Sequence, residues 1–203
     1  MGGIVRPELV ESNARILRQV WSQNDVSYQD SFYKFDGVTI EPKPAGPIPF
    51  WYCGNTPASA RRAVEYCDGW MPGRISLGTF QARVDKIAEL SERAGRSKPT
   101  IAVIPPTSVE EDKDRALSYV NIDGLLDWAN KAKYWVKPAS GRFETWEDLS
   151  GTLIAGTPDD AVAECRKFEE AGNEHLVFDF RFKFDRWFEQ IELIGTEVLP
   201  RLR

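Results

Sequence analysis

The residues best suited to bind a charged ligand follow an apolar run in the first third of the chain. Residues 48–53 form this run, Gly54 ends it, and Asn55, Thr56 and Pro57 precede a helical pattern. A continuous apolar run is typical of a strand that is buried on both faces, as in parallel sheets. Pro57 suits the first position of a helix, and Thr56 suits its cap. The sequence therefore predicts a strand, a turn and a helix start in close succession.

The start of this helix is a candidate site for a phosphate group. A helix that opens at the carboxyl end of a strand presents backbone N–H groups and the positive end of its dipole to an anion. Thr56 and Ser59 add hydroxyl groups at the same place. The alternative is that glycine, threonine and proline only shape and cap the turn. The residue types alone leave both interpretations open.

Two arginines each follow an expected strand, and both are candidate anion-binding residues. Arg74 and Arg181 each carry a planar guanidinium group, which binds phosphate or carboxylate through paired hydrogen bonds. Either residue could therefore meet a cofactor phosphate or an anionic substrate. The alternative for Arg74 is a solvated arginine in a loop. The alternative for Arg181 is an ion pair with Asp179 or Asp185.

Other reactive side chains predict less chemistry. Cys53 has no evident base to activate its thiol, so we expect it only to line a site. His175 begins an expected strand, away from the carboxyl end, and is expected to pack. With one histidine, three cysteines and no Cys-x-x-Cys motif, the sequence predicts no metal site. A set of aromatic residues could cover a planar ligand or pack an inserted segment, and comprises Trp128, Tyr134, Trp135 and Trp146.

Length and charge exclude several classes of protein. The 203 residues suffice for one domain with its own core. A net charge of −5 gives no electrostatic reason to bind nucleic acid or an anionic membrane. No apolar run approaches the ~20 residues that span a bilayer, and no apolar secretory signal is visible at the N-terminus. We therefore expect a cytoplasmic protein without nucleic-acid or membrane partners.

Expected strands alternate with expected helices along the chain. The strands are 48–53, 70–71, 100–104 and 175–180, and the helices are 7–23, 57–67, 77–94, 112–120, 157–171 and 184–198. A polar, aromatic segment, 121–150, is inserted before the last helix–strand unit. A long connector, 24–47, contains short extended pieces at 26–28 and 32–35. Repeated strand–helix units predict an α/β fold with a parallel sheet, either a small open sheet or half of an eight-stranded barrel.

Several segments, taken in order, resemble the bacterial luciferase-like monooxygenases, which are flavin- or deazaflavin (F420)-dependent TIM-barrel oxidoreductases. These segments are EPKPAGPIPFWYCG, GNTPASARRAVEYCDGWMP, GTPDDAVAECRKFEEAGNEHLVFDFRF and EVLPRLR. The resemblance covers nearly the whole chain, and it is carried by the ordered set rather than by one motif. It implies a (βα) half-barrel that corresponds to strands five to eight of a TIM barrel. It also implies one domain over residues 1–203 that lacks the N-terminal half of the barrel.

The resemblance implies a role for a few residues. Active sites of TIM barrels lie at the carboxyl ends of the strands, where Arg74 and Arg181 are further candidates for cofactor binding. In this family the segment after the fifth strand helps to bind the phosphate of the cofactor, FMN or F420. That segment is matched here by Gly54, Asn55, Thr56 and Ser59.

The implied function is that of an FMN- or F420-dependent oxidoreductase or monooxygenase that acts on a small molecule. Catalytic residues stay unassigned because the cofactor carries the chemistry. Without the first half of the barrel, the chain is expected to have little activity by itself. The alternative is a non-catalytic half-barrel that binds a phosphorylated ligand or serves as an assembly partner, and an unrelated open α/β sheet is a third interpretation. Two apolar edge strands, 48–53 and 175–180, predict a homodimer.

Overall fold

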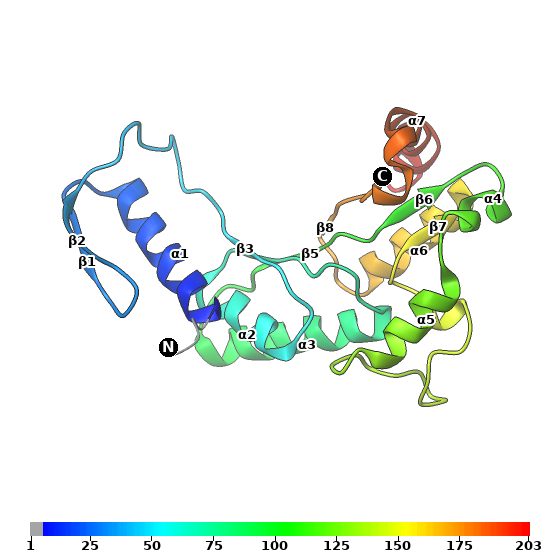
Figure 1. Ribbon diagram of the computed structural model, residues 1–203, viewed down its shortest axis with the longest axis horizontal. Coiled ribbons are helices and arrows are strands. Elements are labelled where there is room, and N and C mark those ends of the chain that lie inside the picture. Colours follow the sequence, from blue (N-terminus) through cyan, green and yellow to red (C-terminus); the bar gives the residue numbers. More distant parts are fainter. Residues whose placement is uncertain (1–5) are drawn as a thin grey trace. The chain divides into compact units, whose positions relative to one another are not determined.

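The computed structural model describes residues 6–203, and these residues form two units (Figure 1). One unit ends at Phe50, and the other runs from Trp51 to Arg203. The first unit contains helix α1 (Arg6–Ser22) and an antiparallel hairpin of β1 (Val26–Gln29) and β2 (Lys34–Val38). The predictions of a helix over 7–23 and of extended pieces in the connector are confirmed.

The second unit is built on a four-stranded parallel sheet. Its strands are adjacent in the order β3 (Trp51–Tyr52), β4 (Gly69–Trp70), β5 (Thr100–Val103) and β8 (His175–Leu176). All four strands expected from the sequence are present and parallel, so the α/β class is confirmed. Three of them, β3, β5 and β8, are shorter than predicted, and β4 has the expected length but lies one residue earlier.

Prolines explain why the strands are short. Pro105 and Pro106 follow β5 and have no N–H group to donate to a neighbouring strand. The ladder between β5 and β8 is therefore interrupted there. It resumes where the Thr107 N–H donates to the carbonyl of Asp179 at 2.6 Å and the Asp179 N–H donates to that of Pro105 at 3.2 Å. On the other side of the sheet, β4 ends at Trp70, two residues before Pro72, and pairs with β3 over two residues.

The sequence did not predict a second parallel pair of strands. Strands β6 (Thr107–Val109) and β7 (Ile154–Gly156) are paired and fully buried. The two prolines do end β5, as expected, but no expectation covered a new strand that begins directly after them. Proline keeps its carbonyl, and Pro106 accepts a hydrogen bond from the Ile154 N–H at 2.9 Å.

Helices cover the strands largely where the sequence placed them. Helices α2 (Pro57–Tyr66) and α3 (Leu77–Ala94) lie side by side along the four-stranded sheet (Figure 1). Helix α6 (Pro158–Glu170) packs on β7. Stacked rings of Trp70 and Phe80, 5.7 Å apart, join β4 to α3, and Phe168 of α6 meets Phe80 edge-on at 5.5 Å. Burying these large rings supplies much of the core.

The inserted segment and the C-terminal segment complete this unit. Between β6 and β7 lie α4 (Lys113–Ser118), α5 (Ile122–Lys131) and a short turn, η1 (Glu147–Leu149). The expected single helix over 184–198 is instead four pieces: η2 (Arg181–Arg186), α7 (Trp187–Leu193), a π turn η3 (Ile194–Val198) and η4 (Leu199–Arg201). The backbone is not helical at Lys183, within η2, nor at Arg186, just before α7. The side chain of Lys183 is fully buried and pairs with Glu110. No helix within residues 6–203 has the length and apolar character needed to cross a membrane.

Candidate functional site

The turn after β3 is tight enough to require glycine at one position. Gly54 has a φ of 152°, which side chains rarely adopt. A Cβ atom at Gly54 would lie 2.5 Å from the Oγ atom of Ser59. The indole Nε1 of Trp70 donates to the Gly54 carbonyl at 2.9 Å and holds the turn against β4. The backbone at Gly54 and the first turn of α2 are therefore in close contact.

Thr56 caps helix α2, as the sequence predicted. Its Oγ1 atom accepts a hydrogen bond from the Ser59 N–H at 3.1 Å and lies 2.8 Å from Ser59 Oγ. Gly54, Thr56 and Ser59 are thus brought together at one end of the helix. Capping already uses one lone pair of Thr56, but the paired hydroxyl groups can still donate or accept one further hydrogen bond.

Asn55 connects this turn to the loop that carries Arg74. Its Nδ2 atom donates to the backbone carbonyl of Arg74 at 3.2 Å. Its own carbonyl accepts from the Nε of Arg83 at 3.3 Å. The side chain of Asn55 is therefore occupied within the protein, and any contact of Asn55 with a ligand falls to its backbone N–H or to the remaining amide hydrogen.

Arg83 is a functional candidate that sequence reasoning missed. It lies on the core side of α3 and is 8% exposed, and its terminal nitrogen donates to the carbonyl of Tyr134 at 2.7 Å. Burial lowers the pKa of this guanidinium. No ion pair between Arg83 and a carboxylate occurs among the described residues. A usable signal was present, because Arg83 shares the apolar face of the helix with Phe80 and Ile87.

The positive charge of Arg181 acts on Arg74. Burial is the main reason that the pKa of Arg74 is lowered, the positive charge of Arg181 lowers it further, and Asp179 partly opposes this. Arg181 forms an ion pair with Asp179, which also accepts a hydrogen bond from the Arg181 backbone N–H at 3.1 Å. The expected alternative for Arg181, pairing with Asp179, is confirmed. Arg74 is not simply solvated, because its guanidinium lies over the ring of Trp128, 5.2 Å from the centroid.

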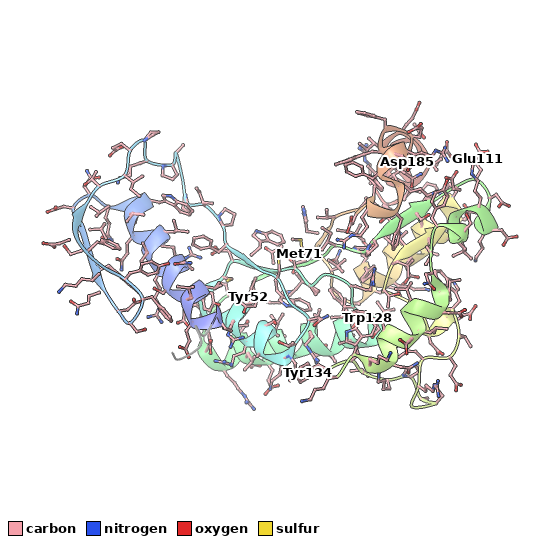
Figure 2. The ribbon with its side chains drawn as sticks, viewed as in Figure 1. Tyr52, Met71, Glu111, Trp128, Tyr134 and Asp185 are labelled. Carbon is pink, nitrogen blue, oxygen red and sulfur yellow. The ribbon has the colours of Figure 1, made fainter. Side chains whose placement is uncertain are left out.

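The remaining candidates are His175, Cys53 and the aromatic residues of the inserted segment. His175 meets Trp51 edge-on at 5.5 Å, as expected of a packing histidine. Cys53 is an exposed free thiol. Trp135 is 6% exposed and packs edge-on against Trp128 and Phe143, so this part of the aromatic set stabilises the inserted segment. Trp128 and Tyr134, labelled in Figure 2, are 39% and 49% exposed and remain available to a ligand.

Together, the parallel strands and the polar groups beyond their carboxyl ends define an α/β protein with a candidate anion-binding site at one sheet edge. The family model of the luciferase-like monooxygenases matches residues 6–175. The chain belongs to this family, and the match includes residues of both units.

Two curated relatives of the chain differ in the cofactor that their names state. The F420-dependent glucose-6-phosphate dehydrogenase of Nakamurella multipartita is 24% identical over 217 residues, which cover 99% of this chain and 63% of the relative. The FMNH(2)-dependent dimethylsulfone monooxygenase of Pseudomonas fluorescens is 24% identical over 95% of this chain and 57% of the relative. The chain thus spans about 60% of the length of these relatives.

Solved structures show the same fold. An F420-dependent secondary alcohol dehydrogenase, solved with an F420–acetone adduct, superimposes with a TM-score of 0.77 at 21% identity, over 100% of this chain and 64% of the other. The FMN complex of the oxygenating constituent of 3,6-diketocamphane monooxygenase from Pseudomonas putida gives 0.71 at 15% identity, over 97% and 64%. At identities of 21% and 15%, this likeness shows the fold alone.

Proposed function

We propose that this chain binds FMN or F420 and belongs to an oxidoreductase or monooxygenase that acts on a small molecule. The observation that carries the proposal is the turn at Gly54. A Cβ atom there would overlap the Oγ atom of Ser59, so the turn lies tight against the start of α2, and a buried, positively charged Arg83 supports the next carbonyl. A close backbone approach, a helix start and a nearby positive charge together suit a phosphate group.

The proposed residues divide the work of holding a cofactor. Gly54, Asn55, Thr56 and Ser59 would face its phosphate, and Arg74 and Arg181 would bind an anionic group of the cofactor or of the substrate at the same sheet edge. When bound, a reduced flavin or deazaflavin supplies a hydride or activates oxygen. The chain's own residues would bind and orient the cofactor. The inserted segment, with Trp128 and Tyr134, would limit the access of water to that edge.

We further propose that β3, β4, β5 and β8 correspond to strands five to eight of a TIM barrel, and that residues 1–203 belong to a single luciferase-like domain. The order of the four strands supports the first point. The family match over residues 6–175, which draws on both units, supports the second.

Paired substitutions test the phosphate assignment. Replacing both Thr56 and Ser59 by alanine should weaken FMN or F420 binding by roughly 1–3 kcal/mol, as expected when hydrogen bonds to a charged group are lost. The matched control is Thr157→Ala, which removes the cap of α6 and leaves the turn at Gly54 intact. Fluorescence titration of each variant measures the affinity. An unchanged affinity in the double variant contradicts the assignment.

A second candidate function is ligand binding without turnover. The observation in its favour is that β3 and β8 lie at the two open ends of the sheet, so this unit does not close a barrel by itself. The chain would then bind a phosphorylated ligand or serve as an assembly partner. A homodimer through these edges is our proposal for the assembly, and sedimentation at micromolar concentration tests it. Cofactor binding without substrate-dependent turnover would favour this second function.

A further inference from the structure

The guanidinium of Arg74 is only partly satisfied by the protein. Arg74 follows β4, and its Nε atom is buried without a hydrogen-bond partner among the described residues. Buried polar groups are nearly always paired in folded proteins, so an unpaired charged donor needs an explanation. The ring of Trp128 covers one face of the guanidinium and leaves its in-plane donors for another partner.

Positive charge is in excess around Arg74. Arg181 acts on Arg74 as a like charge, whereas Asp179 is the carboxylate that opposes it. Asp179 is already held by both the side chain and the backbone N–H of Arg181. Two guanidinium groups therefore share one carboxylate in a partly buried place. Bringing like charges together is unfavourable unless an anion joins them.

A buried ion pair holds the segment that follows Arg181. Lys183, two residues further on, is fully buried and pairs with Glu110, which also accepts a hydrogen bond from Arg186 at 2.7 Å. The Lys183 ammonium also lies 3.4 Å from the centroid of the Tyr119 ring. These contacts anchor the segment that begins at Arg181.

We infer that Arg74 and Arg181 together bind one oxyanion of the substrate, with Trp128 as an apolar wall beside it. The inference rests on the proposed function, which supplies the reaction for which the substrate is bound. The chemical class is a small molecule with a phosphate, carboxylate or sulfonate group. Guanidinium groups bind all three through paired N–H donors. The cofactor phosphate is assigned to the turn at Gly54, which has donors of its own.

Calorimetric titration with inorganic phosphate, at constant ionic strength, tests the pair. Arg74→Met and Arg181→Met should each weaken phosphate binding roughly tenfold or more, because a charge-assisted hydrogen bond is lost. The control is Arg61→Met, which removes an exposed arginine of α2 that pairs with Glu65. Phosphate binding should also change the tryptophan fluorescence of the wild-type chain, through Trp128, and should leave that of Trp128→Phe unchanged. If Arg74→Met does not fold, the exposed Arg181→Met carries the test.

Titration with FMN and with riboflavin, which lacks the phosphate, separates this inference from the proposed function. Arg74→Met and Arg181→Met should keep the preference of the wild-type chain for FMN. If they abolish that preference, the anion is the cofactor phosphate and the substrate assignment is wrong. The inference is also overturned if inorganic phosphate fails to bind the wild-type chain, or binds both variants as tightly. A wild-type chain that binds phosphate at these arginines but neither FMN nor F420 contradicts the proposed function alone.

Discussion

The Nε atom of Arg83 donates to the carbonyl of Asn55 at 3.3 Å, so a buried charge on helix α3 supports the turn at the start of helix α2. The same guanidinium donates to the carbonyl of Tyr134 in the inserted segment. One residue thus connects the turn proposed to bind the cofactor with the segment proposed to cover it. A guanidinium that is bonded to carbonyls keeps its full charge for a nearby anion.

Replacing Arg83 therefore should weaken anion binding at the turn. We expect Arg83→Met, which keeps much of the side-chain volume, to lower FMN affinity by roughly 1–3 kcal/mol. Arg83→Lys restores the charge but not both carbonyl contacts, and should recover only part of the loss. Fluorescence titration measures affinity, and urea unfolding separates it from stability. Equal affinity in Arg83→Met and the wild-type chain would remove Arg83 from the site.

A side chain at Gly54 should distort the turn. Gly54→Ala places a Cβ atom against Ser59 at a backbone conformation that alanine rarely adopts. We expect a loss of roughly 1–3 kcal/mol in the free energy of unfolding. Gly73→Ala is the matched control, because a Cβ atom at Gly73 meets nothing within 4 Å. If urea denaturation gives both variants the same stability, the turn is less constrained than its geometry indicates.

Removing the charge of Glu110 should destabilise the C-terminal segment. Glu110 is buried and faces Lys183, Arg186 and Arg115, and only Lys183 is fully buried. Glu110→Gln leaves the buried ammonium without its counter-charge, and breaking a buried pair in this way costs about 3–5 kcal/mol. The control is Glu111→Gln, at the exposed neighbouring position. Thermal unfolding that is unchanged in Glu110→Gln would show that water or another group satisfies Lys183.

The first unit should lose stability in acid. The hydroxyl of Ser12 is the main cause that lowers the pKa of Asp30 from 3.8 to about 2, and the Phe32 and Tyr33 N–H groups contribute. Because the folded pKa lies below the unfolded one, this stabilisation is present above about pH 4 and is lost as pH falls towards 2. The protection of the β1 and β2 amides from hydrogen exchange, relative to an unfolded chain at the same pH, should fall over that range in the wild-type chain. Asp30→Asn should exchange faster at neutral pH and lack this dependence, whereas Asp123→Asn should match the wild type.

Much of the fold follows from local sequence signals. Helix α3 begins after its Ser76 cap and ends before Gly95, whose φ of 59° closes it, so its bounds could be predicted to the residue. The cap of α2 at Thr56 and the capping box of α6 at Thr157 were equally legible. Such signals depend on neighbours in the chain, which the sequence displays directly.

Other features depend on partners that are distant in sequence. Strands β6 and β7 pair although 44 residues, 110–153, separate them in the chain, and no local pattern marks that pairing. Lys183 lies in a polar segment and is buried only because Glu110 faces it. For the site, residue types located the turn at Gly54, but the contacts of Arg83 and the effect of Arg181 on Arg74 required the structure.

The most direct test of the central claim compares FMN, riboflavin and F420 in fluorescence titrations of the wild-type chain. If the turn at Gly54 binds a cofactor phosphate, FMN or F420 should bind, and FMN should bind more tightly than riboflavin by roughly 1–3 kcal/mol. The preference for FMN should shrink as salt is added, because salt screens partly exposed charges. Equal affinity for FMN and riboflavin, together with no binding of F420, would contradict the account.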